Sequence, residues 1–587
     1  MPAIGIMKAT RNLLLTLLPL AACAGPSLEV SAPELQDHVE WLADDAQEGR
    51  KTGSDGAYRS AEYLKDRLLL AGLEPGGPNG SWFQEFEVQM PPAPGFSKLI
   101  VDGKSIENIR TVAASPNEEA TGTLISAAYG VVFPAHDLDD FAAVDVSGKV
   151  VLVRRYTEFG FDASEEVKSL GNLRKKVRNA AAAGAIGIIL GTHPDDMKIG
   201  GEELTSFKAV QGAMPIPVIT VNSATFARLE KQSQKGVEAH LAPQVLHETR
   251  IARNVIAATP GNTEEWVVVG AHYDHLGFGG EGSLAPGSHK VHHGADDNAS
   301  GTAMTLELAE TWGVKYAAGE VGERGMLFCF WSGEEMGLLG SAFWVENPTL
   351  ELGHVVGNLN LDMVGRLEGG TVTVGSAATA AAFGPALEHA QSIMDADHVA
   401  MNLNVMAGEM AGGGGSDHMS FHKMDIPAIF FFSGIHSDYH KPSDTADKVT
   451  YAAMADLAVG LVAFLEHLQS SPRQDFAYIK PEAPKDAGKG RRGMADGIWF
   501  GSMPDYGAMT ERGMLINGTS AGSPAEKAGL LAGDIIIKVG PVDIGDIYDF
   551  MESLADFHNG QTITVVVLRD GKSTDLSLTF FPRPSGE

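Results

Sequence analysis

The chain reads His293-Gly294-Ala295-Asp296-Asp297-Asn298-Ala299-Ser300-Gly301 just before residues 302–312, a run whose apolar spacing predicts an amphipathic helix. Two adjacent carboxylates thus lie in a loop that contains glycine at both ends. Such a loop can present a carboxylate to a cleft as a metal ligand or as a general acid or base. The same residue types are also the usual helix caps. Taken alone, the loop favours the cap, so its meaning depends on the rest of the chain.

Four other segments share one design, in which a short apolar run ends abruptly in residues that can bind a metal. The runs 266–270, 326–330, 359–361 and 426–432 lead to His272-Tyr273-Asp274-His275, Glu334-Glu335, Asp362 and Asp438-Tyr439-His440. Continuous apolar runs that alternate with helical stretches predict an α/β fold, a mostly parallel sheet with helices on both faces. Ligands of such a sheet bind outside the carboxyl ends of its strands. We therefore expect one cleft to collect these polar residues.

The collected side chains form a chemically coherent set of histidines, aspartates and two adjacent glutamates. Imidazole and carboxylate are ligands that zinc accepts, and a catalytic zinc site keeps one position open for water. A bridging carboxylate would let two metals about 3.5–4 Å apart share a hydroxide. Only one residue of the Glu334-Glu335 pair is needed as a ligand. The other could then take the proton from the attacking water.

The order of these motifs resembles a known family. His-x-Asp, Gly-Ala-Asp-Asp-x-Ala-Ser-Gly, Glu-Glu, Leu-Asp-Met and a late His-x-x-x-Asp-Thr occur in this sequence as they do in the di-zinc aminopeptidases. These are bacterial leucyl-aminopeptidase-like enzymes, related to glutamate carboxypeptidase, the transferrin receptor and glutaminyl cyclase. The resemblance implies an α/β/α sandwich that holds two Zn²⁺ ions, bridged by Asp297 and a water or hydroxide.

The resemblance also implies a role for each matching residue. The implied metal ligands are His272, Asp297, Glu335, Asp362 and His440. Glu334 matches the general base, Asp274 the carboxylate that orients His272, and Tyr439 a residue that steadies the tetrahedral intermediate. The implied activity is zinc-dependent removal of N-terminal residues from peptides that have a free N-terminus.

Three alternatives remain beside the aminopeptidase. The first is a carboxypeptidase of the glutamate-releasing type, which places cations near its site. Arg366 is the basic residue close to a ligand in sequence, and we interpret it as a structural ion-pair partner. The second is a one-metal glutaminyl cyclase, and the third is a non-catalytic envelope receptor or scaffold. Metal counting and substrate turnover would separate them.

Charge and the first residues bear on location. A formal net charge of -31 over 587 residues argues against nucleic-acid binding, which needs a basic footprint. Lys8 and Arg11 precede an apolar run at 13–20, too short for a membrane span. The run ends in Leu-Ala-Ala-Cys23, which resembles a bacterial lipobox. We expect 1–23 to be an export signal and Cys23 a lipid anchor in the cell envelope; the alternative is an ordinary signal peptide and a secreted protein.

Changes of pattern divide the rest of the chain. We predict a peptidase domain at 24–114 and 248–471, an insert at 115–247, a linker at 472–493 and a last domain at 494–584. The β-rich insert resembles the protease-associated (PA) domain and contains no ligand cluster, so we expect a lid or substrate-guiding module. Its predicted helix presents Arg174, Lys175, Lys176 and Arg178, for which we expect a solvated face.

The last domain resembles a PDZ domain of the bacterial protease type. PDZ domains bind extended peptides by adding a strand to a sheet edge. The stretch Trp499-Phe500-Gly501-Ser502-Met503-Pro504 stands where the carboxylate-binding loop is expected and does not match it cleanly. This mismatch counts against binding of a peptide C-terminus. A peptide or protein ligand is expected, with a packing or docking role as the alternative.

Three further motifs lie near the predicted cleft. The run Gly277-Phe-Gly-Gly-Glu-Gly282 matches GxGxxG, but no helix follows, so the dinucleotide reading fails and a loop beside the metals is expected. His289, His292 and His293 are expected to be loop residues and not ligands. Asp417 and His418 match a Ser-Asp-His motif of the family and are expected to support the site's architecture.

Overall fold

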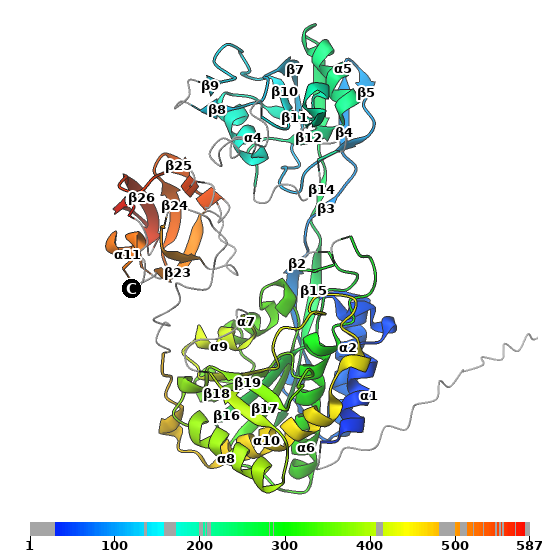
Figure 1. Cartoon of the computed structure of the whole chain (residues 1–587), viewed down its shortest axis with the longest axis vertical. Helices are drawn as coiled ribbons and strands as arrows, with labels where there is room; N and C mark the ends of the chain where they lie inside the picture. Colours follow the sequence, from blue (N-terminus) through cyan, green and yellow to red (C-terminus); the bar gives the residue numbers. More distant parts are fainter. Residues whose placement is uncertain are drawn as a thin grey trace, which may run out of the picture. The chain divides into compact units, whose positions relative to one another are not determined.

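The computed structural model divides the chain into two compact units, 1–88 with 251–485 and 89–250 with 486–587 (Figure 1). It describes residues 30–133, 138–157, 172–198, 204–205, 207, 213–280, 282–285, 287–406, 415–480, 499–504, 513–519, 522–531, 533–545, 549–550, 553–554, 557–569 and 571–581. The predicted export segment 1–23, with Lys8, Arg11 and Cys23, lies outside these residues, as does most of the predicted linker.

The first unit is built on a nine-stranded sheet with the order β1-β15-β17-β16-β18-β21-β19-β20, and β2 pairs with β15. The strands are β1 (Glu74–Pro75), β2 (Phe83–Gln89), β15 (Thr249–Thr259), β16 (Trp266–His272), β17 (Gly325–Trp331), β18 (Val355–Leu361), β19 (Thr371–Gly375), β20 (Asn402–Val405) and β21 (Ala428–Phe432). Strands β17, β16, β18 and β21 run parallel at the centre. Antiparallel partners β15 and β19 flank them. The predicted mostly parallel sheet is confirmed.

Both faces of this sheet are buried under helices, as the apolar runs predict. Val267 and Val269 of β16 pack into one core, whereas Val268 between them packs into another. The first core includes residues of α1 (Ala32–Leu42), α2 (Asp55–Leu70), α6 (Gly301–Ala317), α8 (Phe383–Ala396) and α10 (Tyr451–Ser470). The second includes Trp344 of α7 (Leu339–Glu346) and Phe421 of α9 (His418–His422). Alternate side chains of one strand therefore serve opposite layers, which is the geometry of an α/β/α sandwich.

The turn after α1 brings an N-terminal segment to the carboxyl edge of the sheet. The 3₁₀ turn η1 (Asp45–Arg50) contains Gly49 with φ 65°, and a Cβ there would lie 2.5 Å from the carbonyl oxygen of His292. Only glycine fits such a close approach in this conformation. Arg50 follows directly and enters the interior beside that edge.

Helix α10 is long and apolar enough, by composition alone, to cross a membrane. Half of its most apolar window is buried inside the first unit, where Leu457, Leu461 and Phe464 join the sheet core. Its apolar character is accounted for by this packing.

The insert forms a second sheet, with the order β5-β4-β13-β7-β10-β11-β12-β6. Its strands are β4 (Lys98–Val101), β5 (Lys104–Ser105), β6 (Ile109–Arg110), β7 (Ala120–Ser126), β10 (Val150–Arg154), β11 (Gly187–Gly191), β12 (Val218–Val221) and β13 (Glu238–Ala242). Helices α4 (Leu173–Ala182) and α5 (Ser223–Ser233) pack against it, and alternate strand residues fill two separate cores. The predicted β-rich insert is confirmed.

The expected solvated face of α4 is wrong for three of its four basic residues, since Arg178 forms an ion pair with the buried Asp549 and two others lie inside the fold. Arg174 and Lys176 are buried. The Lys176 ammonium donates hydrogen bonds of 2.6–2.7 Å to the carbonyl oxygens of Tyr129, Arg154 and Tyr156. Burial lowers the pKa of Lys176 to about 7. The residue therefore ties α4 to the loop after β7 and to the end of β10, because its long stem lets the ammonium reach all three carbonyls.

The last domain contains a six-stranded sheet in the order β22-β23-β24-β26-β27, with β25 paired to β24. The strands are β22 (Ser502–Pro504), β23 (Met514–Thr519), β24 (Ile535–Val539), β25 (Val542–Asp543), β26 (Thr562–Arg569) and β27 (Lys572–Thr579). Helix α11 (Pro524–Lys527) begins at Ser523, whose side chain accepts the amide of Glu526. Phe500, Ile516, Val565 and Phe580 lie in its own apolar core.

Candidate metal centre

The carboxyl ends of the central strands bring the predicted site residues together. His272 is the last residue of β16 and pairs in register with Trp331, the last residue of β17. Three residues beyond Trp331, the 3₁₀ turn η6 (Glu334–Met336) carries both glutamates, and Asp362 follows the end of β18. Asp297 comes from a different kind of segment, the turn η5 (Ala295–Ser300) that leads into α6. The common edge forms because parallel strands end together.

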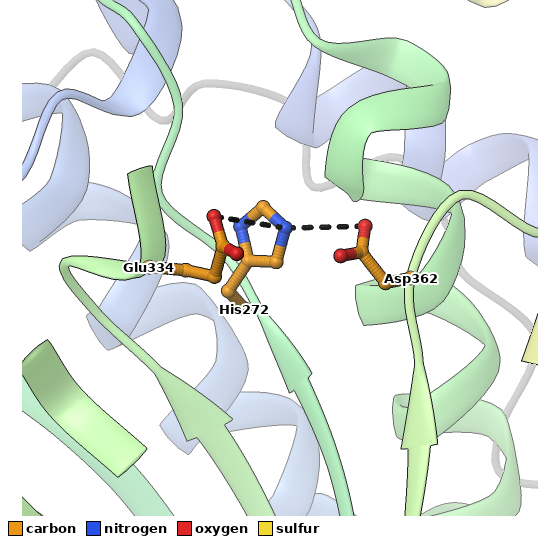
Figure 2. Close-up of side chains that lie close together, drawn as sticks. All are labelled: His272, Glu334 and Asp362. Atoms are coloured by element: carbon orange, nitrogen blue, oxygen red, sulfur yellow. Dashed lines mark hydrogen bonds and ion pairs between the residues drawn. The ribbon is translucent and has the colours of Figure 1, made fainter. Parts of the chain in front are cut away.

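One group of potential ligands surrounds His272 (Figure 2). Its Nε2 lies 3.3 Å from Asp362 Oδ1, 3.5 Å from Asp297 Oδ1 and 3.9 Å from Glu334 Oε2. The ring is 1% exposed, so these contacts form in an environment with little water. Imidazole and carboxylate oxygens at such spacing fit the donor set of zinc.

A second group lies on the other side of Asp297. His440 Nε2 is 3.1 Å from Asp297 Oδ2 and 3.1 Å from Glu335 Oε2. The two oxygens of Asp297 thus face different histidines, Oδ1 toward His272 and Oδ2 toward His440. A carboxylate placed in this way is suited to join two metal sites.

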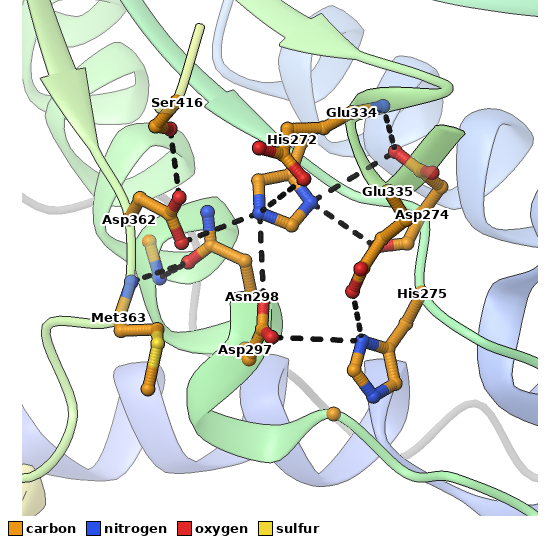
Figure 3. Close-up of polar contacts among 12 residues, drawn as sticks. His272, Asp274, His275, Asp297, Asn298, Glu334, Glu335, Asp362, Met363 and Ser416 are labelled. Carbon is orange, nitrogen blue, oxygen red and sulfur yellow. Dashed lines mark hydrogen bonds and ion pairs between the residues drawn. The ribbon is translucent and has the colours of Figure 1, made fainter. Parts of the chain in front are cut away.

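Sequence reasoning missed one residue of this second group. His275 lies 2.6 Å through Nδ1 from Glu335 Oε1, and the two form a potential metal group with Asp297 (Figure 3). The sequence contained a signal, because His275 stands three residues after His272 at the same strand end. It lay outside the matching His-x-Asp pattern and so received no role.

Asp274 supports the site through both its main chain and its side chain. Its carbonyl oxygen is 3.2 Å from His272 Nδ1, closer than its carboxylate at 3.8 Å. The carboxylate accepts hydrogen bonds from the Thr52 hydroxyl at 2.8 Å and the Glu334 amide at 3.2 Å. The imidazole of His272 and the turn that carries Glu334 are therefore held by the same residue.

The loop that carries Asp297 is held by a second carboxylate. Asp444 Oδ2 accepts the backbone amides of Asp296 and Asp297 at 2.9 and 3.1 Å. Asn298 ties the loop to the end of β18, since its side chain donates to the Leu361 carbonyl and accepts the Met363 amide. The position of Asp297 is set by these neighbours, and the whole turn is buried.

Asp296 points away from the ligands, although it is adjacent to Asp297. One of its oxygens accepts the Gly365 amide at 2.6 Å and the Ser300 hydroxyl at 3.0 Å. The other lies 3.1 Å from His436 Nε2. The two aspartates of the pair thus have different roles: Asp297 faces the potential metal ligands, and Asp296 stabilises the loop.

Arg50 is a further residue that the sequence did not single out. Its buried guanidinium donates to the carbonyl oxygens of Leu42, Tyr273, His293 and Gly294 at 2.6–2.9 Å. Burial lowers its pKa to about 10, against the opposing effect of nearby carboxylates, first among them Asp297. Arg50 therefore fastens the N-terminal segment, the end of β16 and the start of the Asp297 loop to one cation.

Charge is distributed unevenly over the two glutamates. Burial raises the pKa of Glu334 well above its usual range, and the neighbouring Asp362 adds to this effect. Burial acts in the same sense on Glu335, but His275 and His440 overcome it and hold its pKa well below the usual range. Several carboxylates confined in one dry space favour a bound cation. The donor set and its burial both fit a metal.

The loops near the centre support its ligands. His440 Nδ1 lies 2.8 Å from the Gly282 carbonyl, so the GxGxxG stretch contacts a predicted ligand. The Tyr439 ring stacks on His440 at 3.8 Å, and burial raises the pKa of its hydroxyl far above the usual range. From the Ser-Asp-His motif, the Ser416 hydroxyl donates to Asp362 Oδ2 at 2.7 Å, and Asp417 and His418 are buried beside it.

The remaining candidates lie away from the ligand atoms. His292 contacts Ser283 and the Lys290 carbonyl, and His293 contacts the Ala43 carbonyl. His289 is exposed. Arg366 lies 3.2 Å from Asp444 and 3.4 Å from Asp438, which makes it an ion-pair partner as interpreted from the sequence.

Comparison with known proteins finds three domain matches. Residues 254–465 match peptidase family M28, residues 120–229 match the PA domain and residues 506–580 match the PDZ domain.

Two curated relatives and one solved structure extend these matches. An aminopeptidase of Pseudomonas aeruginosa is 30% identical over 233 residues, which are 39% of this chain and only 37% of that protein. A probable lipoprotein aminopeptidase, LpqL, of Mycobacterium tuberculosis is 26% identical over 74% of this chain and 84% of its own length. A solved zinc aminopeptidase from Bacillus subtilis aligns with 76% of this chain and 98% of its own, with 21% identity and a TM-score of 0.44.

Proposed function

Since residues 254–465 of the chain belong to peptidase family M28, we propose that the protein is a zinc-dependent exopeptidase that removes N-terminal residues from peptides. The observation that carries the proposal is the position of Asp297 between His272 and His440, with Glu334 beside His272. The names of the relatives, aminopeptidases of Pseudomonas aeruginosa and Mycobacterium tuberculosis, support the same class of reaction.

Two zinc ions would be held by five side chains. We assign Asp297 as the bridge, with His272 and Asp362 completing one site and Glu335 and His440 the other. Zinc bound there would supply Lewis-acid chemistry, which lowers the pKa of bound water and polarises a carbonyl group. Support for the assignment comes from the neighbours: Ser416 orients Asp362, and the Gly282 carbonyl orients His440. Metal ligands are usually held by such outer partners.

Glu334 is proposed as the general base. Its amide is held by Asp274, and its carboxylate faces the same space as the His272 imidazole. From there it would take the proton of the attacking water and return it to the leaving amine. Such proton transfer contributes roughly 10²–10⁴-fold to a rate. The Tyr439 hydroxyl would donate a hydrogen bond to the developing oxyanion, and its raised pKa keeps that hydroxyl protonated.

The charge around the centre favours an aminopeptidase over a carboxypeptidase. A carboxypeptidase needs a cation free to bind the product carboxylate. Arg366 is engaged with Asp438 and Asp444, and Arg50 with four backbone carbonyls.

The test combines metal content with a substrate panel, on protein that lacks residues 1–23. We expect about two zinc ions per chain and cleavage of peptides with a free N-terminus, but not of N-blocked ones. Release of C-terminal residues would move the assignment to carboxypeptidase. One metal with cyclisation of N-terminal glutamine would move it to the cyclase, and absence of both metal and turnover would leave a binding protein.

Location and partners complete the proposal. We propose export through residues 1–23 and anchoring through a lipid on Cys23; the lipoprotein named among the relatives supports this. Mass spectrometry of the mature N-terminal peptide would detect the lipid. The PDZ domain is proposed to bind an extended peptide or a protein segment at a strand edge.

A further inference from the structure

His275 is a buried histidine that the assigned set of ligands does not use. Its side chain is fully inaccessible, and its Nδ1 lies 2.6 Å from Glu335 Oε1. The other Glu335 oxygen, Oε2, lies 3.1 Å from His440 Nε2. Each oxygen of this carboxylate therefore has its own histidine. Figure 3 shows the His275 ring reaching toward Glu335 and Asp297 from the segment that also carries His272 and Asp274.

Two segments hold His275 in place, one through its backbone and one against its ring. His275 pairs with Lys51 in an isolated parallel β-bridge, and the His275 amide donates a hydrogen bond to the Arg50 carbonyl at 3.2 Å. Gly294 packs against the ring, where a Cβ would lie 2.6 Å from both Cγ and Cδ2. Gly294 has φ 57°, so backbone and space both favour glycine there. The imidazole is held in one orientation by parts of the chain that also hold the Asp297 loop.

The two ring nitrogens of His275 differ in their partners. Nδ1 faces a carboxylate oxygen, which can only accept a hydrogen bond while it is ionised. Nε2 is buried and has no hydrogen-bond partner among the described residues. A proton on Nε2 would be an unpaired buried donor, which is costly. The ring proton therefore belongs on Nδ1. A protonated Nδ1 has no lone pair with which to bind a metal.

We propose that His275 is a positioning residue for the second metal site: it donates its Nδ1 hydrogen to Glu335 Oε1 and so turns Oε2 toward the metal and His440. This inference rests on the proposed function. The tetrapeptide His272-Tyr273-Asp274-His275 would then serve both metal sites. His272 is a ligand of the first site and Asp274 orients it, whereas His275 orients Glu335, a ligand of the second site. Loss of such an outer partner typically weakens metal affinity by about 10–100-fold.

The experiment measures zinc affinity of the full exported chain without residues 1–23, by competition with a chromophoric chelator. His275→Leu removes the donor and is expected to weaken the second zinc by about 10–100-fold, with the first zinc unchanged. His275→Asn places an amide N–H near the position of Nδ1 and is expected to restore affinity to within a few-fold of the unsubstituted protein. His292→Asn is the matched control, because His292 is also buried and its ring contacts the Ser283 hydroxyl and the Lys290 carbonyl in place of a carboxylate of any described residue.

The outcomes separate this inference from the function on which it rests. Equal loss of the second zinc in His275→Leu and His275→Asn would make His275 a direct ligand and overturn the positioning role. Unchanged affinity in His275→Leu would overturn any role in the site. The absorption spectrum of the cobalt-substituted protein adds a readout, since it should keep its band positions in His275→Asn. A second zinc missing from the unsubstituted chain would overturn the two-metal centre itself, and this inference with it.

Discussion

Glu334 and Glu335 are neighbours in the chain, yet the structure gives them opposite surroundings. Glu335 lies between His275 and His440, and its pKa is held well below the usual range. Glu334 lies beside His272 and Asp362, and burial raises its pKa. Glu334 faces His272 at the end of β16, whereas Glu335 faces His275 and His440. A ligand and a proton carrier can therefore be adjacent in sequence.

This division of roles predicts the effects of two matched substitutions. Glu334→Gln removes the base but retains a side chain of the same size, so we expect turnover to fall by at least about 10²-fold while zinc content stays at the unsubstituted level. Glu335→Gln should instead lower the zinc content. Metal analysis and peptide hydrolysis measure both. Turnover near the unsubstituted level in Glu334→Gln would exclude it as the base.

His440 predicts a pH dependence of the zinc-free protein. Burial opposes its charge, but Asp297 and Glu335 outweigh this and raise its pKa from 6.5 to about 11. Because the folded-state pKa is the higher one, this stabilisation is complete below about pH 6.5 and is lost as the pH rises toward 11. We expect the melting temperature of the chelator-treated protein to fall between pH 6.5 and 10. His440→Gln should flatten that dependence, and an unchanged slope would contradict the assignment.

Among the elements, the turn η5 depends most on contacts made elsewhere in the chain. Its two amides are held by Asp444, and the loop before it is held by Arg50. The four carbonyls around Arg50 come from three separate segments. The Arg50 guanidinium and these four carbonyls form a backbone junction, which holds the loop that carries Asp297.

Removing that junction should affect both stability and metal binding. A buried acceptor left without a donor costs about 1–3 kcal/mol, so we expect Arg50→Met to lower the free energy of unfolding by at least about 3 kcal/mol and to weaken zinc binding. Denaturant unfolding and chelator competition would measure the two effects. Arg59→Met is the control, because Arg59 is 43% exposed and its loss should cost far less. Similar stability of the two variants would contradict the role given to Arg50.

At the scale of the whole molecule, the chain consists of parts with their own cores. The residues of the M28 match pack around the nine-stranded sheet, and the PDZ domain fills a separate apolar core with Phe500, Ile516 and Val565. The metal centre uses residues of the first unit alone. The proposed recognition of a ligand by the PDZ domain and the proposed chemistry at the candidate metal centre therefore use different units of the chain.

This separation predicts the behaviour of a chain that ends at residue 480. We expect it to hydrolyse a short aminoacyl substrate with a kcat/KM within about threefold of the longer chain, since no metal-site contact is removed. Any change should be confined to longer peptides or protein partners that the PDZ domain would bind. Loss of turnover on the short substrate, with the melting temperature of the sheet unit unchanged, would show that residues after 480 act in catalysis.

The pattern of apolar runs alone predicts the mostly parallel sheet and the polar residues that meet at its carboxyl edge. Apolar runs that end in His272, Glu334 and Asp362 predict this because burial of both faces and parallel alignment leave few other arrangements. The likeness to a family selected Asp297 over Asp296, a choice that spacing alone did not make. The prediction that Lys176 is solvated is wrong, because sequence periodicity does not show where backbone carbonyls lie that can accept a hydrogen bond from a buried ammonium.

The contacts that support the ligands could not be predicted from the sequence. Arg50 meets Gly294 across 244 residues, and His275 meets Glu335 across 60. Nothing in the sequence of one segment predicts that it contacts the other. The partners of Arg50 are backbone carbonyls, which every residue possesses. Ligand types and strand ends are local properties of a chain, whereas the orientation of each ligand depends on which distant groups pack against it.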